Sequence, residues 1–134
     1  MESQLVFLSD LNFNLDVWKR ELKFQESEMD YFEEKLEEVV MRKLGVEVDV
    51  QLEKFQNKII REKEVMGHLR HRIRMKKREI AQTKFEDGSE AKFHEKQVLL
   101  REEMKTFIKM HYQLKEEMMD FCYPTFHLTE LSHL

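Results

Sequence analysis

Three side chains on one stretch of the chain have the spacing of a metal site. Glu64, His68 and His71 follow one another at intervals of four and three, so a helix would stack these potential zinc ligands on one face. The surrounding apolar pattern turns that face toward solvent, and neither a fourth ligand nor supporting hydrogen-bond partners accompany it. We therefore interpret the three residues as a solvated face and predict no metal and no cofactor.

Catalytic motifs are missing elsewhere in the sequence. A di-iron bundle needs inward Glu-x-x-His pairs on two helices, and the single pair with that spacing is Glu130 and His133. The sequence contains no Gly-rich phosphate loop, no Gly-x-Ser-x-Gly and no His-Glu-x-x-His. We expect a protein that is not an enzyme.

Apolar residues at alternating spacings of three and four form three long series. Each series gives one apolar seam on a helix, and three helices can bury their seams together. The prediction is an all-α fold, an antiparallel three-helix bundle of coiled-coil character, formed by 1–134 as a single domain. The first seam is expected over 15–39, the second over 52–83 and the third over 93–121.

Capping and turn residues predict where these helices begin and end. An asparagine at position 12 or 14 can begin the first helix, and Gly45 is a favourable residue just after its end. Asp49 can cap the second helix, and Pro124 should stop the third near Cys122. The expected helices cover about 13–44, 49–84 and 90–122, joined by short turns at 45–48 and 85–89, and 123–134 forms a tail.

Five polar residues interrupt the apolar seams. If the chain reverses near residues 46 and 88, Glu62 falls within a helical turn of His111, with Gln25 one further turn along. A second polar level would place Lys76 near Gln97. Polar seam residues usually select register and partner number, and we favour that role for them. A proton-responsive or ligand-binding core is the alternative, because histidine titrates near neutral pH.

The middle helix is basic although the chain as a whole has a net charge of −4. Residues 47–84 hold eleven Lys and Arg against six Asp and Glu, whereas 15–44 and 86–122 each hold six against nine. We expect its cations to pair with the neighbouring helices. Binding of an anion or nucleic acid is the alternative, through Arg70, Arg72, Arg74, Lys77 and Arg78.

Two of the helices carry apolar residues that the seams do not use. These outward positions form a candidate protein interface, because contiguous exposed apolar patches usually mark one. Either the short apolar terminal arms, near residues 5–11 and 126–134, fold back over them, or a second chain covers them. We favour a homodimer. The candidate interface residues are Val17, Phe24, Tyr31, Val98, Tyr112 and Met119.

Composition narrows the compartment and the class of protein. Cys122 is the single cysteine, which fits a reducing environment, and no apolar run approaches the ~18 residues that cross a bilayer. The start of the chain has only a short apolar run with acidic flanks, unlike a signal peptide. The sequence thus favours a non-enzymatic cytoplasmic scaffold or adaptor that associates with itself or another protein. Anion or nucleic-acid binding ranks second, and a metal-binding or catalytic bundle third.

Overall fold

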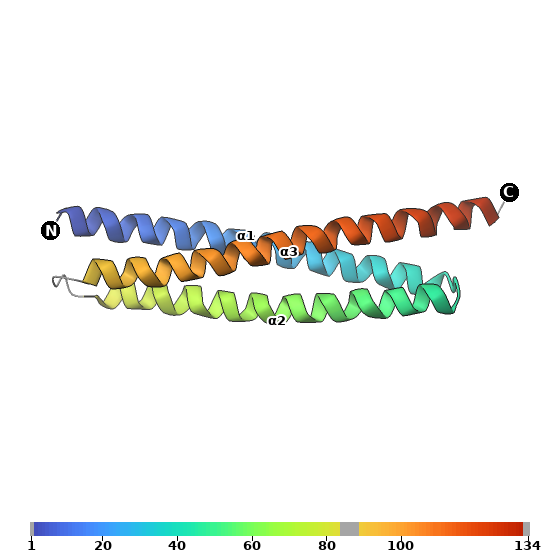
Figure 1. Cartoon of the computed structure of the whole chain (residues 1–134), viewed down its shortest axis with the longest axis horizontal. Helices are drawn as coiled ribbons and strands as arrows, with labels where there is room; N and C mark the ends of the chain where they lie inside the picture. The colour runs from blue at the N-terminus through green and yellow to red at the C-terminus, as the bar shows by residue number, and fades with distance from the viewer. Residues whose placement is uncertain (1, 84–88, 133–134) are drawn as a thin grey trace.

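Three long helices make up the described chain. A computed structural model describes residues 2–83 and 89–132, with side chains described over 7–83 and 91–123. The helices are α1 (Glu2–Met41), α2 (Val46–Gln82) and α3 (Ser89–Ser132). Consecutive helices run in opposite directions and all three pack against one another (Figure 1). The structure confirms the predicted antiparallel three-helix bundle.

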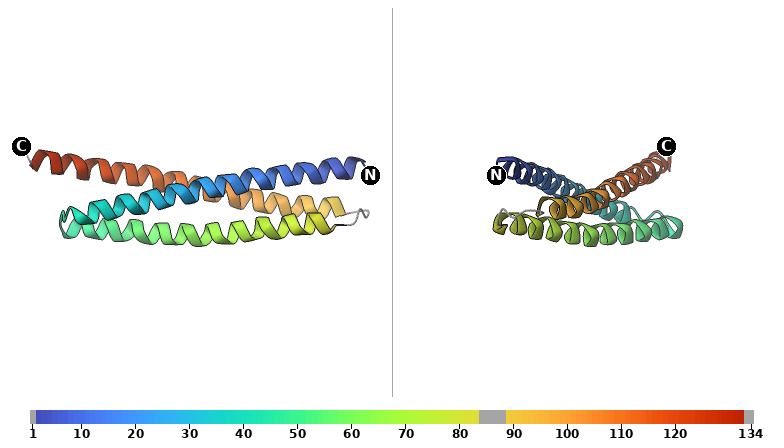
Figure 2. Two further views of the ribbon diagram at one scale, coloured as in Figure 1. Left: turned by 180° about the vertical axis from the view of Figure 1, so that it is seen from behind. Right: turned by 60° about the vertical axis from the view of Figure 1, so that its left-hand side comes forward.

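The helices α1 and α3 lie on the same side of α2. Figure 2 shows them crossing each other above α2, so that their ends diverge. The two termini lie at opposite ends of the molecule, and the last turns of α3 extend beyond the turn between α1 and α2 (Figure 1). Side chains line hollows between α1 and α3, between α2 and α3 and between α1 and α2.

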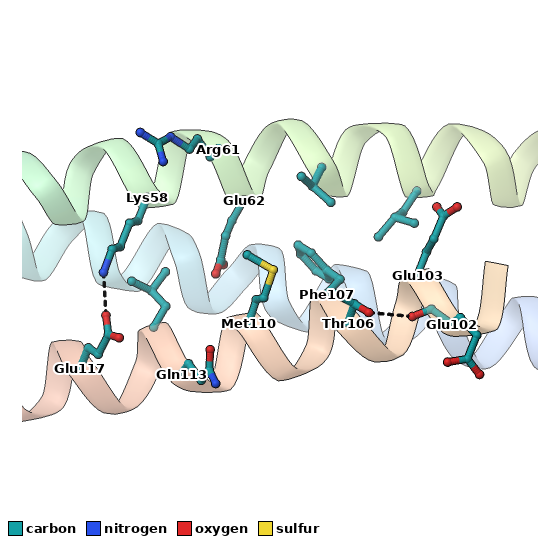
Figure 3. A pocket seen from close by; sticks show the side chains of 13 residues that line it. Lys58, Arg61, Glu62, Glu102, Glu103, Thr106, Phe107, Met110, Gln113 and Glu117 are labelled. Atoms are coloured by element: carbon teal, nitrogen blue, oxygen red, sulfur yellow. Dashed lines mark hydrogen bonds and ion pairs between the residues drawn. The ribbon is translucent and has the colours of Figure 1, made fainter. Parts of the chain in front are cut away.

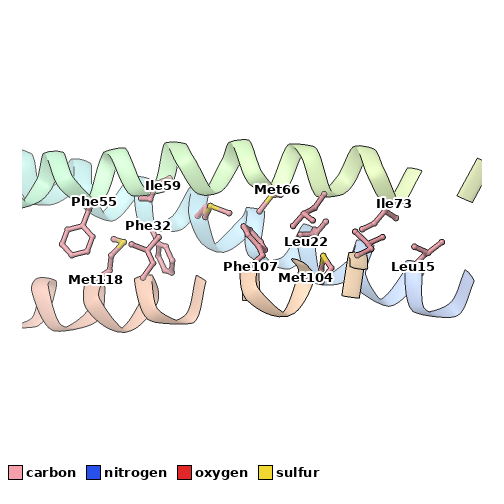
Figure 4. Close-up of a cluster of buried hydrophobic side chains, with 14 of the residues drawn as sticks. Leu15, Leu22, Phe32, Phe55, Ile59, Met66, Ile73, Met104, Phe107 and Met118 are labelled. Carbon is pink, nitrogen blue, oxygen red and sulfur yellow. The ribbon is translucent and has the colours of Figure 1, made fainter. Parts of the chain in front are cut away.

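The predicted seams form one continuous core along the bundle. Phe32, Phe55 and Met118 lie close together at one end, and Leu15 and Ile73 belong to the same cluster toward the other end (Figure 4). Nearly every seam position is buried, as the period of three and four requires. Because charged residues occupy most of the remaining surface of each helix, none of the helices in the described ranges is apolar enough over sufficient length to cross a membrane.

The first helix begins eleven residues earlier than the caps predict. We expected Asn12 or Asn14 to begin it and an apolar arm to precede it, whereas α1 starts at Glu2. The helix begins early because the apolar seam extends toward the N-terminus. Leu8, Leu11 and Leu15 continue the seam's spacing of three and four residues. Leu11 is only 4% exposed. Burial of these side chains outweighs the capping preference of an asparagine, which is worth about 1 kcal/mol.

Gly45, in the turn between α1 and α2, has a different role from the predicted one. The first helix ends at Met41, three residues before the predicted end, and Lys43 adopts a left-handed conformation with φ 51°. Gly45 has φ 113° and is the residue before α2, so Asp49 lies inside the first turn instead of capping it. The early bend lets Leu44 pack against the core.

The third helix continues through Pro124. We expected it to stop near Cys122 and to leave 123–134 as a tail, but α3 runs to Ser132. A proline removes one backbone hydrogen bond and ends most helices, yet neither glycine nor a second proline follows here, so the helix resumes. Both arms therefore extend α1 and α3 and do not fold back over the outward positions. The predicted turn residues at 85–88 lie outside the described ranges.

Candidate functional site

A buried histidine connects all three helices near the middle of the bundle. His111 of α3 is 1% exposed, and its Nδ1 lies 3.1 Å from Oε2 of Glu62 on α2. Its Nε2 lies 3.0 Å from Oε1 of Glu28 on α1, and Phe32 stacks on the ring with a centroid distance of 5.8 Å. The structure therefore brings together Glu62 and His111, as the register of the seams predicts.

The two carboxylates favour the charged form of His111. Both ring nitrogens face an acceptor oxygen, and both can donate only when the imidazole carries two protons. Burial disfavours that charge, but the hydrogen bonds to Glu62 and Glu28 outweigh it and raise the pKa of His111 above its usual 6.5. Burial likewise opposes ionisation of Glu28, but hydrogen bonds from Lys115 and His111 prevail and lower its pKa below the usual value.

Sequence reasoning missed two members of this layer. Glu28 and Lys115 flank the seams, and their ion pair closes the layer toward solvent. Gln25 is buried but stays apart, since its Nε2 donates to Glu21 of the same helix over 3.0 Å. A flanking glutamate near a polar seam position is the signal that could have indicated Glu28.

The second polar level binds main-chain carbonyls. Lys76 donates from Nζ to the oxygen of Phe93 over 3.1 Å, and Gln97, one turn along α3, donates to the oxygen of Leu11 over 3.2 Å. Burial lowers the pKa of Lys76 to about 8. The two side chains occupy the same level, as predicted, but each is held by backbone and not by the other.

Most of the basic cluster is paired within the bundle. Arg70 pairs with Glu26 and Lys77 with Asp16, both on α1, while Arg72 pairs with Glu103 on α3. The remaining two candidates, Arg74 and Arg78, are exposed and form no ion pair with a residue in the described ranges. Arg70, Arg74 and Lys77 also line a small groove of about 300 Å³ between α1 and α2, with Lys19 and Lys23 on its other side.

The candidate zinc ligands stay on the surface. Glu64, His68 and His71 are exposed, and within the described residues no three His, Cys, Asp or Glu side chains converge as a metal site. In the buried layer, Glu62 and Glu28 bind opposite nitrogens of His111, so their carboxylates cannot meet at one ion. Glu130 and His133 lie outside the residues whose side chains are described.

Outward apolar residues of α1 and α3 come together at two places. Lys115 lies over two aromatic rings, with its Nζ 6.0 Å from the centre of Phe24 and 5.7 Å from that of Tyr112. Further along, Tyr31 of α1 and Met119 of α3 line a hollow of about 360 Å³. We define the α1–α3 face by the residues Phe24, Tyr31, Tyr112, Met119 and Tyr123, each more than half exposed.

The other two interface candidates lie outside this face. Val17 and Val98 are exposed at 45% and 42%, and neither lines the hollow that holds Tyr31 and Met119. The helix α2 also exposes apolar side chains, at Val50, Ile60 and Val65, with irregular spacing that forms no stripe. The meeting of aromatic residues from α1 and α3 is therefore the feature that distinguishes a candidate interface from scattered apolar residues.

Comparison of the chain with protein-family models, with curated proteins and with solved structures found no match. The chemistry of its own surfaces is therefore the basis for the function proposed next.

Proposed function

We propose that this protein is a non-enzymatic cytoplasmic scaffold whose α1–α3 face binds protein, and that its first partner is a second copy of the chain. The observation that carries the proposal is that exposed aromatic residues of α1 and α3 come together, Phe24 and Tyr112 around Lys115 and Tyr31 and Tyr123 at one hollow. Phe24 is 53% exposed, Tyr31 67% and Tyr112 52%. A lone cysteine supports the assignment to a reducing compartment.

Energetics favour covering this face. Burying one large apolar side chain contributes roughly 1.5 to 3 kcal/mol, and the five residues of the α1–α3 face forgo much of that while they remain in water. The charges at the centre, Glu28 and Lys115, form an ion pair and sum to zero. Two copies can therefore approach about a two-fold axis without repulsion between like charges at the centre.

The test uses one double variant. Phe24→Glu combined with Tyr112→Glu places four carboxylates in a two-fold interface, and should convert a dimer into a helical monomer because the inner seams remain intact. Light scattering gives the mass and circular dichroism the helix content. A wild-type monomer at ~100 μM would rule out a homodimer of ordinary affinity.

A matched control separates the interface from added charge. Val50→Glu with Ile60→Glu adds the same charge to exposed positions of α2, at 47% and 54% exposure, away from the α1–α3 face. This control should remain a dimer. Dissociation by both double variants would show that charge alone, and not the α1–α3 face, controls association. Unfolding by the first variant alone would place Phe24 and Tyr112 in the chain's own core.

A further inference from the structure

The hollows along the bundle differ in how completely their charges are paired. In the groove between α2 and α3, which measures about 550 Å³, Lys58 pairs with Glu117 over 2.8 Å (Figure 3). Glu103 of the same groove pairs with Arg72. The smaller groove between α1 and α2 is different, because most of its cations have no acidic partner in the described part of the chain.

Five cations and one acid, Glu26, line the groove between α1 and α2, which measures about 300 Å³. Arg70 is paired with this acid. Lys77 is paired with Asp16. The other three cations are exposed and form no ion pair with any residue in 7–83 or 91–123; they are Lys19 and Lys23 of α1 and Arg74 of α2.

The two ion pairs enclose these three cations along the antiparallel helices. On α1 the two lysines lie between the paired acids, and on α2 Arg74 lies between the paired cations. Residues 70–77 of α2 contain no Asp or Glu. On α1, Glu21 falls within the enclosed stretch, but it accepts a hydrogen bond from Gln25 and does not line the groove. The three cations therefore share one groove without an acid between them.

The spacing of these residues places like charges close together. Lys19 and Lys23 are four residues apart on α1, and Arg74 lies four residues from an arginine on either side along α2. Like charges at this spacing repel one another and destabilise a helix, so the cluster is unfavourable until an anion neutralises it. Ile73, which is 2% exposed, adds apolar surface to the groove and strengthens the attraction between its cations and an anion.

We propose that the groove between α1 and α2 binds a small molecule through a diphosphate group, held by Lys19, Lys23 and Arg74. Each phosphate carries roughly 1.5 to 2 negative charges near pH 7, so a diphosphate matches three cations that lack a partner. The planar guanidinium can donate two parallel hydrogen bonds to phosphate oxygens, and the lysines supply point charges.

The dimensions and surroundings of the groove favour a small anion over a nucleic acid. A nucleic acid would extend along α1, where residues 15–44 hold nine Asp and Glu against six Lys and Arg. None of the residues that line the groove belongs to the α1–α3 face, so diphosphate binding does not require the proposed dimer.

Isothermal titration calorimetry with inorganic pyrophosphate tests the ligand class. The titrations use metal-free buffer at about pH 7 and a constant ionic strength of about 150 mM, so that screening is equal for every anion. We expect a dissociation constant of about 1 mM or tighter for pyrophosphate. Sulfate should bind roughly tenfold more weakly, because a single tetrahedral anion reaches fewer of the cations. Equal affinity for the two anions, or no heat of binding from pyrophosphate, would overturn the proposal.

A matched pair of double variants tests the location. Lys23→Gln with Arg74→Gln removes two of the three cations and should weaken pyrophosphate binding roughly tenfold or more. Lys54→Gln with Arg101→Gln removes the same charge from exposed positions that do not line this groove, and should leave the affinity unchanged. If circular dichroism shows that the first variant unfolds, Lys19→Gln replaces it and should weaken binding several-fold. Equal affinities of the groove variant and the control would refute this location.

Discussion

At the scale of single residues, His111 gives the bundle a measurable dependence on pH. A histidine whose pKa is raised by folding stabilises the fold below about pH 6.5, and that contribution is lost as the pH rises through the folded-state pKa. We expect the free energy of unfolding of the wild type to fall as the pH rises through this range. The His111→Leu variant should show no such fall. Urea melts at intervals upward from about pH 5.5 measure it. A parallel pH dependence in the two proteins would contradict the prediction.

The pair of Glu62 and His111 should also show energetic coupling. Removing one partner leaves the other buried without its hydrogen bond, which costs about 1 to 3 kcal/mol, whereas removing both leaves no such group. Glu62→Leu with His111→Leu should therefore destabilise the fold by less than the sum of the single changes. Denaturant melts of the three variants give the coupling free energy, and simple additivity would show that the two side chains do not interact.

Replacing Lys76 by an apolar residue should stabilise the fold. Its folded-state pKa of about 8 lies below the ordinary 10.5, so the charged side chain opposes folding at neutral pH. Lys76→Met should raise the free energy of unfolding at pH 7 by about 1 to 3 kcal/mol. The advantage should shrink as the pH rises from about 8 toward 10.5, because wild type gains stability there. Melts of both proteins at pH ~7 and ~9.5 check this, and an advantage independent of pH would contradict it.

At the scale of helices, two glycines should respond oppositely to the same substitution. Gly67 lies within α2, and a methyl group added there would meet no atom within 4 Å. Gly67→Ala should stabilise the fold by about 1 kcal/mol through helix propensity. Gly45→Ala should destabilise it, because φ 113° strains any residue with a side chain. Thermal unfolding compares the two variants, and changes of the same sign would contradict this account of the turn.

The start of α1 follows burial more closely than capping. Asn12 and Asn14 are good caps, but α1 begins at Glu2 and buries Leu11 and Leu15 on either side of them. Capping preferences are worth about 1 kcal/mol each, which a single buried leucine exceeds. Long helices with sparse glycine therefore have ends that depend on packing partners.

At the scale of the whole molecule, the distribution of charge leads us to expect that nucleic acid is not a partner. The net charge is −4, and Arg70, Arg72 and Lys77 pair with acidic residues of the neighbouring helices. We expect no binding of labelled single- or double-stranded oligonucleotides at ~10 μM protein and about 50 mM salt, where electrostatic binding is strong. Fluorescence anisotropy measures it. Binding that weakens steeply with salt, and with Arg70→Ala plus Arg74→Ala, would instead support the basic surface as a site.

The sequence alone determined the three helices, their buried seams and the levels at which polar groups enter the core. The reason is that the spacing of apolar residues is a local property of each helix, and short turns align equivalent levels on neighbouring helices. The sequence was therefore sufficient to predict that Glu62 lies beside His111 and that Lys76 lies at the level of Gln97.

Only the tertiary structure decided which residues beside the seams join the polar layers in the core. Glu28 reaches His111 while Gln25 turns back to Glu21, and both outcomes depend on how each helix is rotated and offset along its neighbours. The same geometry brings aromatic residues of α1 and α3 together at two places and opens grooves between α2 and α3 and between α1 and α2. A periodic pattern specifies which face of a helix is buried, but the rotation and offset of three helices arise from all their contacts together.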